Sequence, residues 1–241
     1  MSKIVTAKQT EDYMERFLDT YKGLVGILFV YGCICLVMLW QHPNFLYFML
    51  PWNLLLAILP LFFIGKAEVA MEQRRKVWLI FWLGAWLFFF PNSVYMVTDF
   101  IHISGDTFLW AQEVERYSTD SRVIYSHELM VWAKLLIIGF GFFSSIIIGL
   151  ESLYTFERMM RKRFAASVCY GMMFVVVCLT GIGVYIGRFL RFNSWDILFD
   201  PLDLLRQVVA LDGFAIQFSV IFAVFVFGCY MLYRMIRSWS K

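Results

Sequence analysis

Six long apolar stretches restrict this chain to one class of fold. They are Leu24–Trp40, Phe45–Ile64, Val77–Val97, Leu129–Leu150, Phe164–Ile186 and Phe214–Tyr233. Each is close to the roughly 20 residues that a helix needs to cross a hydrocarbon core. With 61% hydrophobic and 16% charged residues, the composition excludes a soluble domain of this size. We therefore predict an all-α fold, a polytopic membrane helix bundle of six transmembrane helices, because lipid offers the backbone no other hydrogen-bond partners.

The lysines and arginines predict how this bundle is oriented. Most of them fall on one side of a six-helix arrangement: Lys3, Lys8, Arg16, Lys22, Lys66, Arg74, Arg75, Lys76, Arg158, Arg161, Lys162, Arg163, Arg234, Arg237 and Lys241. The other side has only Arg116, Arg122, Arg188, Arg191 and Arg206. Because cytoplasmic segments carry the positive excess, both termini are predicted to be cytoplasmic in a multi-pass protein of the cell membrane. The predicted parts are a cytoplasmic amphipathic segment (1–23), a transmembrane domain (24–233) and a cytoplasmic tail (234–241).

Sequence motifs for common cofactors are missing. The chain contains no Walker loop, no dinucleotide fingerprint and no HExxH motif, so the cofactor is left unknown. All five cysteines fall inside the predicted helices, where they behave as small apolar residues, so neither a disulfide framework nor a thiolate zinc site is indicated. The net charge of +3 averages two unlike faces and indicates no nucleic-acid site.

The first candidate site lies in PNSVYMVTDFIH, where the third apolar stretch ends. If the helix continues through Pro91, the spacing of three, four and three places four polar side chains on one face: Asn92, Tyr95, Asp99 and His102. One interpretation is a helix end with ordinary interfacial residues. The alternative is a site in which Asp99 and His102 form an acid/base pair while Asn92 and Tyr95 position a substrate.

The second candidate site lies in GRFLRFNSWD, where the fifth stretch ends. Arg188 and Arg191 share a helix face on the side of the membrane where arginine is avoided. They either extend to lipid phosphate or bind an anionic group bidentately. Asn193 and Asp196 add side-chain acceptors in a turn, and a short interfacial helix is expected near 201–211.

The two candidate sites are predicted to lie side by side as two walls of one polar pocket, and the fourth helix is predicted to contribute the third wall. His127 and Lys134 are seven residues apart and are expected to share a face. Because an unpaired ammonium in the membrane is costly, Lys134 should snorkel or pair with a carboxylate such as Asp99 or Glu128. Small residues further along allow close helix packing: Gly141, Ser145, Gly149 and Ser152, and in the fifth helix Gly183 and Gly187.

Three blocks of this sequence also resemble a known family. They are WNLLLAILPL (52–61), WLFFFPNSVYMVTDFIHI (86–103) and GIGVYIGRFLRFNSWD (181–196). These blocks are similar to the signature blocks of the bacterial membrane-protein family known as domain of unknown function 1361, over roughly residues 52–212. The resemblance implies no reaction and no cofactor, so it supports the position of the site and leaves its chemistry open.

Three classes of function fit these observations. The first is an enzyme acting on a phosphorylated lipid or a lipid-linked envelope precursor, with Arg188 and Arg191 holding the phosphate. A metal-dependent variant of this enzyme would use the following ligands: Asp99, His102, His127 and Asp196. The second is a transport protein for anions, in which Lys134 or Asn53 lines an inward path. The third is an assembly factor of the cell envelope that binds a protein partner through the loop 103–128.

The expected ligands and partners follow from these three hypotheses. Membrane lipids surround the chain, and an anionic lipid headgroup is the expected ligand of the pocket. The side chains expected to bind it are the following: Asn92, Tyr95, His127, Lys134, Arg188, Arg191, Asn193 and Asp196.

Overall fold

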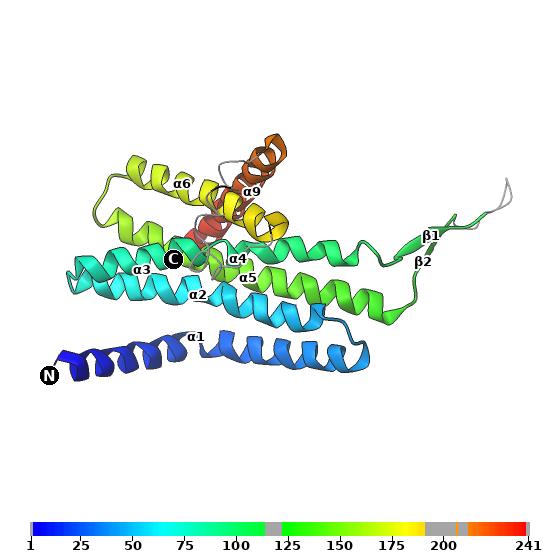
Figure 1. Cartoon of the computed structure of the whole chain (residues 1–241), viewed down its shortest axis with the longest axis horizontal. Helices are drawn as coiled ribbons and strands as arrows, with labels where there is room; N and C mark the ends of the chain where they lie inside the picture. The colour runs from blue at the N-terminus through cyan, green and yellow to red at the C-terminus, as the bar shows by residue number, and fades with distance from the viewer. Residues whose placement is uncertain (1, 114–121, 191–205, 207–211, 240–241) are drawn as a thin grey trace.

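The computed structural model of the protein describes residues 2–113, 122–190, 206 and 212–239, with residues 2–16 and 18 as backbone only. Its helices are α1 (Ser2–Gln41), α2 (Leu46–Glu72), α3 (Lys76–Phe89), α4 (Asn92–Tyr95), the 3-10 helix η1 (Met96–Ile103), α5 (Leu129–Arg161), α6 (Ala166–Tyr185), the π-helical turn η2 (Ile186–Leu190) and α9 (Gly213–Trp239). Two short strands, β1 (Leu109–Ala111) and β2 (Val123–Tyr125), pair antiparallel between η1 and α5 (Figure 1).

Six helical stretches in the described part of the chain are long and apolar enough to cross a membrane. They are Asp19–Gln41, Leu46–Glu72, Lys76–Ile103, Leu129–Arg161, Ala166–Leu190 and Gly213–Trp239. Each predicted apolar stretch coincides largely with one of them, so the predicted helical membrane bundle is confirmed. The two strands were not predicted, and the interfacial helix expected near 201–211 lies outside the described residues apart from residue 206.

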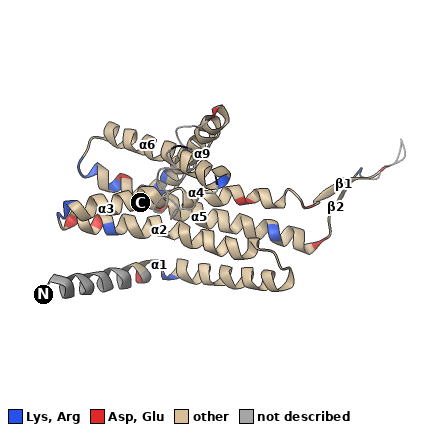
Figure 2. Cartoon of the chain, viewed as in Figure 1, with Lys and Arg blue, Asp and Glu red and all other residues tan. Residues whose placement is uncertain are grey.

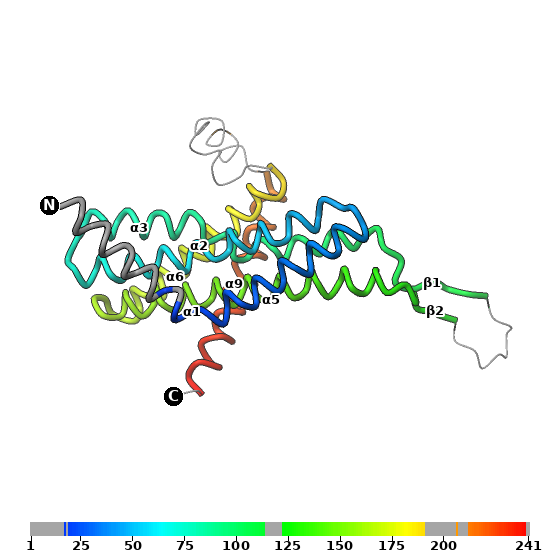
Figure 3. Tube along the Cα trace, turned by 90° about the horizontal axis from the view of Figure 1, so that it is seen from below, coloured from blue at the N-terminus to red at the C-terminus, as the bar shows by residue number. Residues whose placement is uncertain are grey.

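The helices form an elongated bundle with two unlike ends. In both views α1, α2, α3 with η1, and α5 follow the long axis, whereas α9 crosses them steeply (Figures 1 and 3). One end carries the connections α2–α3 (73–75) and α5–α6 (162–165), where lysines and arginines gather; we call it the basic end (Figure 2). At the other end, the hairpin end, β1 and β2 project beyond the helices. The charge rule predicts that the basic end faces the cytoplasm.

The third span continues through Pro91. Phe90 and Pro91 both have right-handed helical dihedral angles (φ −57°, ψ −38° and φ −55°, ψ −29°). The backbone N–H groups of Val94 and Tyr95 donate to the Pro91 carbonyl at 3.1 and 3.0 Å, which keeps the helical course. From Met96 onward the chain tightens into the 3-10 helix η1. The helical path that the polar stripe requires is therefore present, although its last turns have three residues each.

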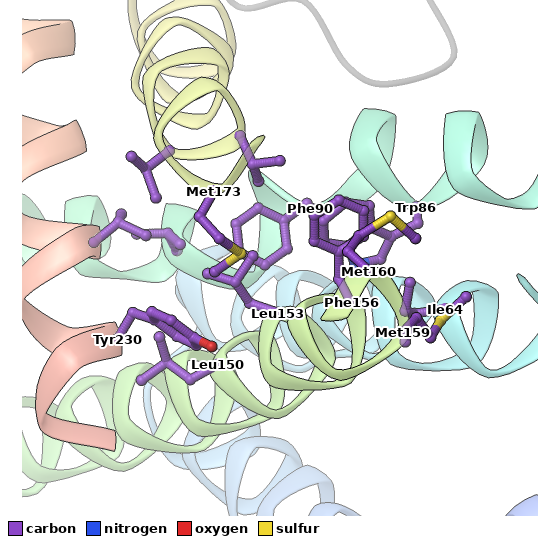
Figure 4. Packing of buried hydrophobic residues seen from close by; sticks show 14 of the residues in the cluster. Ile64, Trp86, Phe90, Leu150, Leu153, Phe156, Met159, Met160, Met173 and Tyr230 are labelled. Atoms are coloured by element: carbon purple, nitrogen blue, oxygen red, sulfur yellow. The ribbon is translucent and has the colours of Figure 1, made fainter. Parts of the chain in front are cut away.

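Aromatic packing dominates the larger core, which joins α2, α3, α5, α6 and α9. Trp86 stacks on Phe156 with ring centroids 4.5 Å apart (Figure 4). The Trp86 indole also donates to the Ser152 hydroxyl at 3.2 Å, so this large side chain is buried with its polar group satisfied. Met173 and Tyr230 extend the same core toward α6 and α9.

Glycines allow the helices around the proline to approach closely, as predicted. A Cβ on Gly149 would lie 2.5 Å from the Cβ of Ser93, and one on Gly183 would lie 2.5 Å from the Cγ of Pro91. At Gly141 a Cβ would collide with a tyrosine of α1. Contacts this short are not tolerated by real Cβ atoms, so α4 is held between α5 and α6 by positions that admit only glycine.

Candidate functional site

Asp99 is the buried carboxylate at the centre of the site. It lies on η1 with 3% of its surface exposed. Its Oδ2 accepts a hydrogen bond from Asn53 Nδ2 of α2 at 3.0 Å, and its Oδ1 lies 3.7 Å from Arg188 Nη1 of η2. Burying a lone carboxylate is costly, and the amide and the guanidinium offset that cost. This contact joins three spans in the half of the bundle nearer the hairpin end.

A cavity of about 470 Å³ lies between α2, the α3–α4 segment and α6, and Asn53, which donates to Asp99, is part of its wall. Its polar lining comes from Asn53, Asn92 and Tyr95, and most of its wall is apolar. Asn53 both lines the cavity and donates to Asp99, so it connects the cavity with the buried carboxylate.

The cavity opens sideways toward the lipid phase. Trp52, Gly84 and Leu179 line it and are exposed on the outer surface of spanning helices. Its α6 wall runs from Leu179 to Gly187, about 12 Å along a helix axis at 1.5 Å per residue. Gly187 immediately precedes Arg188, so the wall ends next to the guanidinium-bearing residue. The cavity is therefore apolar along the helices and polar at its hairpin end.

Arg188 lies in a π-helical turn that follows α6 directly. Such turns are rare and occur frequently at functional sites, because one additional residue per turn redirects the side chains that follow. The Arg188 side chain is 19% exposed. The separation of 3.7 Å from Asp99 is an ion-pair distance and too long for a hydrogen bond, so the guanidinium has donors for another acceptor.

His102 lies one 3-10 turn beyond Asp99 and is exposed. Of the residues predicted to converge at this end, Asp99 and Arg188 form an ion pair with each other.

The structure bears on two expectations about the fourth helix. Lys134 pairs with a carboxylate, as one of the alternatives expected, but that carboxylate is Asp106 (Nζ to Oδ2 2.8 Å) and not Asp99 or Glu128. Asp106 lies in the connection after η1, which the helix path through Pro91 places beside α5. His127 does not share a helix face with Lys134, because Glu128 is the N-cap of α5 and His127 lies exposed in the connection before it.

The polar stripe that the spacing predicted is divided. Asn92 and Tyr95 line the cavity, Asp99 is buried against Asn53, and His102 is exposed. The cause is the change from α-helix to 3-10 helix at Met96, which alters the rotation per residue along the stripe. The four side chains therefore contribute to one region without forming one wall.

Part of the predicted site lies outside the described residues: Arg191, Asn193 and Asp196. Within the described ranges, no three His, Cys, Asp or Glu side chains are grouped as metal ligands would be. Three ligands of the metal-dependent variant, Asp99, His102 and His127, are described and form no such group.

Two residues of the site were not selected from the sequence. The sequence suggested Asn53 only for a transport path. It is the single amide side chain in the apolar stretch 45–64, and a polar group inside a membrane helix needs a hydrogen-bond partner, so this signal could have identified it. Asp106 carried no comparable signal because it lies in a polar connection where acidic residues are common.

The family model described as Protein of unknown function (DUF1361) matches residues 52–233. The chain belongs to this family. The DUF1361 match extends beyond the region of resemblance seen in the sequence and includes every described residue of the cavity except Met49. All of α1 and the first six residues of α2 (46–51) lie before the matched region. No curated protein and no solved structure matches the chain.

Proposed function

We propose that this protein binds a lipid or a lipid-linked molecule that carries an anionic headgroup. The apolar chain of the ligand would occupy the cavity between α2, α3 and α6, and the headgroup would lie at Arg188 near the hairpin end. The main support for this proposal is that the cavity has both apolar and polar walls. Most of its wall is apolar and includes residues exposed on the outer surface of the helices, and its polar part is lined by Asn53, Asn92 and Tyr95.

The charges at the polar end support a phosphate as the headgroup. A planar guanidinium binds phosphate through parallel hydrogen bonds, and Arg188 is only loosely paired with Asp99 at 3.7 Å. When a phosphate binds Arg188, the Asp99 carboxylate keeps its hydrogen bond from Asn53. Binding would therefore exchange one anionic partner of the guanidinium for another without leaving Asp99 unpaired.

A more specific version of this proposal is that the protein catalyses an acid–base reaction on the bound headgroup. His102 is exposed and lies one 3-10 turn beyond Asp99, so we assign to it the exchange of a proton with the headgroup. Asp99 would hold Arg188 in position between binding events. In this form the protein acts on a phosphorylated lipid or a lipid-linked envelope precursor.

Lipid profiling of cells with and without the gene tests this function. We expect one phosphate-bearing lipid species to accumulate in the deletion strain and to return to normal with the wild-type gene. Arg188→Gln should fail to restore the profile at normal protein abundance, whereas Arg122→Gln, exposed at the same end, should restore it. An unchanged profile in the deletion strain would refute action on such a lipid.

Mass spectrometry of co-purifying lipids tests binding separately. Gly84→Leu should reduce the bound lipid, because Gly84 lines the cavity and has open space around its Cα. Gly171→Leu is the matched control: it is also a helical glycine with nothing within 4 Å, and it does not line the cavity. Equal lipid content in both variants would argue against the cavity as the binding site.

The projecting hairpin favours partner binding as a second function. Leu109 and Tyr125 are direct cross-strand neighbours, and they are 53% and 60% exposed. Trp110, 45% exposed, adds a large aromatic surface to the predicted contact loop 103–128. A photo-crosslinking residue at position 110 should capture a protein in intact membranes; cross-links to lipid alone would contradict this function.

The anion-transport alternative has less support. Asn53 lines the cavity, whereas Lys134, the other residue named for an inward path, pairs with Asp106 and does not line it.

A further inference from the structure

Two arginines from different helices lie against one tyrosine at the basic end. The guanidinium carbons of Arg161 (α5) and Arg234 (α9) are 5.3 and 5.4 Å from the ring centroid of Tyr170 (α6). Arg234 Nη1 also donates to the Tyr170 hydroxyl at 2.5 Å. Cation–π contacts and this hydrogen bond restrict how both side chains are oriented.

One buried carboxylate holds both guanidinium groups. Glu157 Oε1 accepts from Arg161 Nε at 2.5 Å and lies 3.7 Å from Arg234 Nη2, while Oε2 accepts from the Tyr230 hydroxyl. The two arginine nitrogens are therefore no more than about 6.2 Å apart, the sum of their distances to the shared oxygen. Glu157 is 3% exposed, but Arg161 and Arg234 are 35% and 33% exposed. The carboxylate fixes the two groups on one side and leaves other donors facing outward.

The local charges do not balance. Glu157 offsets one of its two arginines, and the neighbouring carboxylates are engaged by other cations. Glu68 contacts Arg158 and Lys162, and Glu151 contacts Arg237. Three carboxylates thus face five cations, which leaves a positive excess around the arginine pair.

We infer that Arg161 and Arg234 form a binding site for a phosphate group at the basic end, supplied either by an anionic phospholipid or by a soluble phosphate ester. Two guanidinium groups held close together and partly exposed can both donate to one phosphate. The pair lies at the ends of spanning helices, where lipid headgroups are found. Neither arginine lines the cavity, so this site does not rest on the function proposed above.

The test uses substitutions that keep the charge and remove the guanidinium geometry. Full-length protein in detergent would be titrated with dihexanoyl phosphatidylglycerol, with the zwitterionic phosphatidylcholine analogue, and with glycerol 3-phosphate as the soluble ester. Arg161→Lys and Arg234→Lys should each weaken phosphatidylglycerol binding by about tenfold, because lysine cannot form the bidentate contact. Arg163→Lys, exposed in the same connection, is the matched control and should change nothing.

The possible results separate the source of the phosphate from a general surface charge. Weaker binding confined to phosphatidylglycerol supports a lipid site, and weaker binding of glycerol 3-phosphate as well supports a site for phosphate esters in general. Equal affinity of the wild type for the anionic and zwitterionic lipids overturns the inference. So does unchanged binding in both arginine variants, provided that their thermal unfolding midpoints match the wild type.

Discussion

Gly149→Ala tests the close packing that positions the cavity. Gly149 of α5 lies against Ser93 of α4, and a Cβ there would be 2.5 Å from the Ser93 Cβ and 3.2 Å from its hydroxyl oxygen. Carbon atoms in contact are about 3.5–4.0 Å apart, so α4 and α5 must separate by about 1 Å. Asn92 and Tyr95 lie on α4 and line the cavity, so this shift also disturbs the site.

The expected cost follows from two opposing effects. Overpacking a tight contact destabilises by about 1–3 kcal/mol, and alanine is about 1 kcal/mol more favourable than glycine inside a helix. Gly171→Ala receives only the favourable effect, because nothing lies within 4 Å of its added Cβ. The two variants should therefore differ in free energy of unfolding by roughly 2 kcal/mol.

Thermal unfolding of the purified variants in detergent measures this difference. At equal heating rates Gly149→Ala should unfold about 4–8 °C below Gly171→Ala, since 1 kcal/mol corresponds to about 2–4 °C for a chain of this size. Adding Ser93→Gly to Gly149→Ala removes the colliding Cβ and should recover part of the loss. Equal midpoints for the two alanine variants would refute the packing of α4 against α5.

Three further predictions concern polar contacts. Arg188→Gln should destabilise by no more than about 1 kcal/mol, because its pair with Asp99 is separated by 3.7 Å and the carboxylate keeps its hydrogen bond from Asn53. A double-mutant cycle with Asp99→Asn in a denaturation series measures this coupling, and a much larger value would contradict the loose pairing. A double-mutant cycle for Lys134 and Asp106 should give a coupling of about 1–3 kcal/mol, because the two side chains are only 14% and 22% exposed and lie 2.8 Å apart; no measurable coupling would contradict this ion pair. Trp86→Phe leaves part of the indole volume empty and removes the N–H that donates to the Ser152 hydroxyl, so it should lower the thermal unfolding midpoint. An unchanged midpoint would contradict the packing of Trp86 in the core.

The spans were predictable from the sequence because their signal is local. Twenty consecutive apolar residues identify a membrane helix whatever its neighbours are, so all six stretches were located before any contact was known. The small residues at Gly149 and Gly183 also indicated close packing, although not which helix would pack there. The same local reasoning could not predict β1 and β2, which lie in a polar connection without a clear alternation.

The partners of the polar groups were decided only by the tertiary structure. Asp99 and Lys134 are both costly to leave alone in a membrane, so the sequence indicates that each needs a partner. Which partner each one finds depends on the rotation of every helix about its axis and on where α4 passes into η1, and the hydropathy of the sequence determines neither. Asp99 therefore meets Asn53 and Arg188, and Lys134 meets Asp106.

The basic end shows the same division between sequence and structure. The sequence by itself determined that positive charge gathers there, because that bias follows from the order of spans and loops. Only the tertiary structure decided that Glu157 is buried between two arginines. Helix α9 crosses α5 and α6 steeply (Figure 3), and Arg234 of α9 contacts both Glu157 and Tyr170. Composition determines which segments enter the membrane, whereas helix crossing determines which side chains meet inside it.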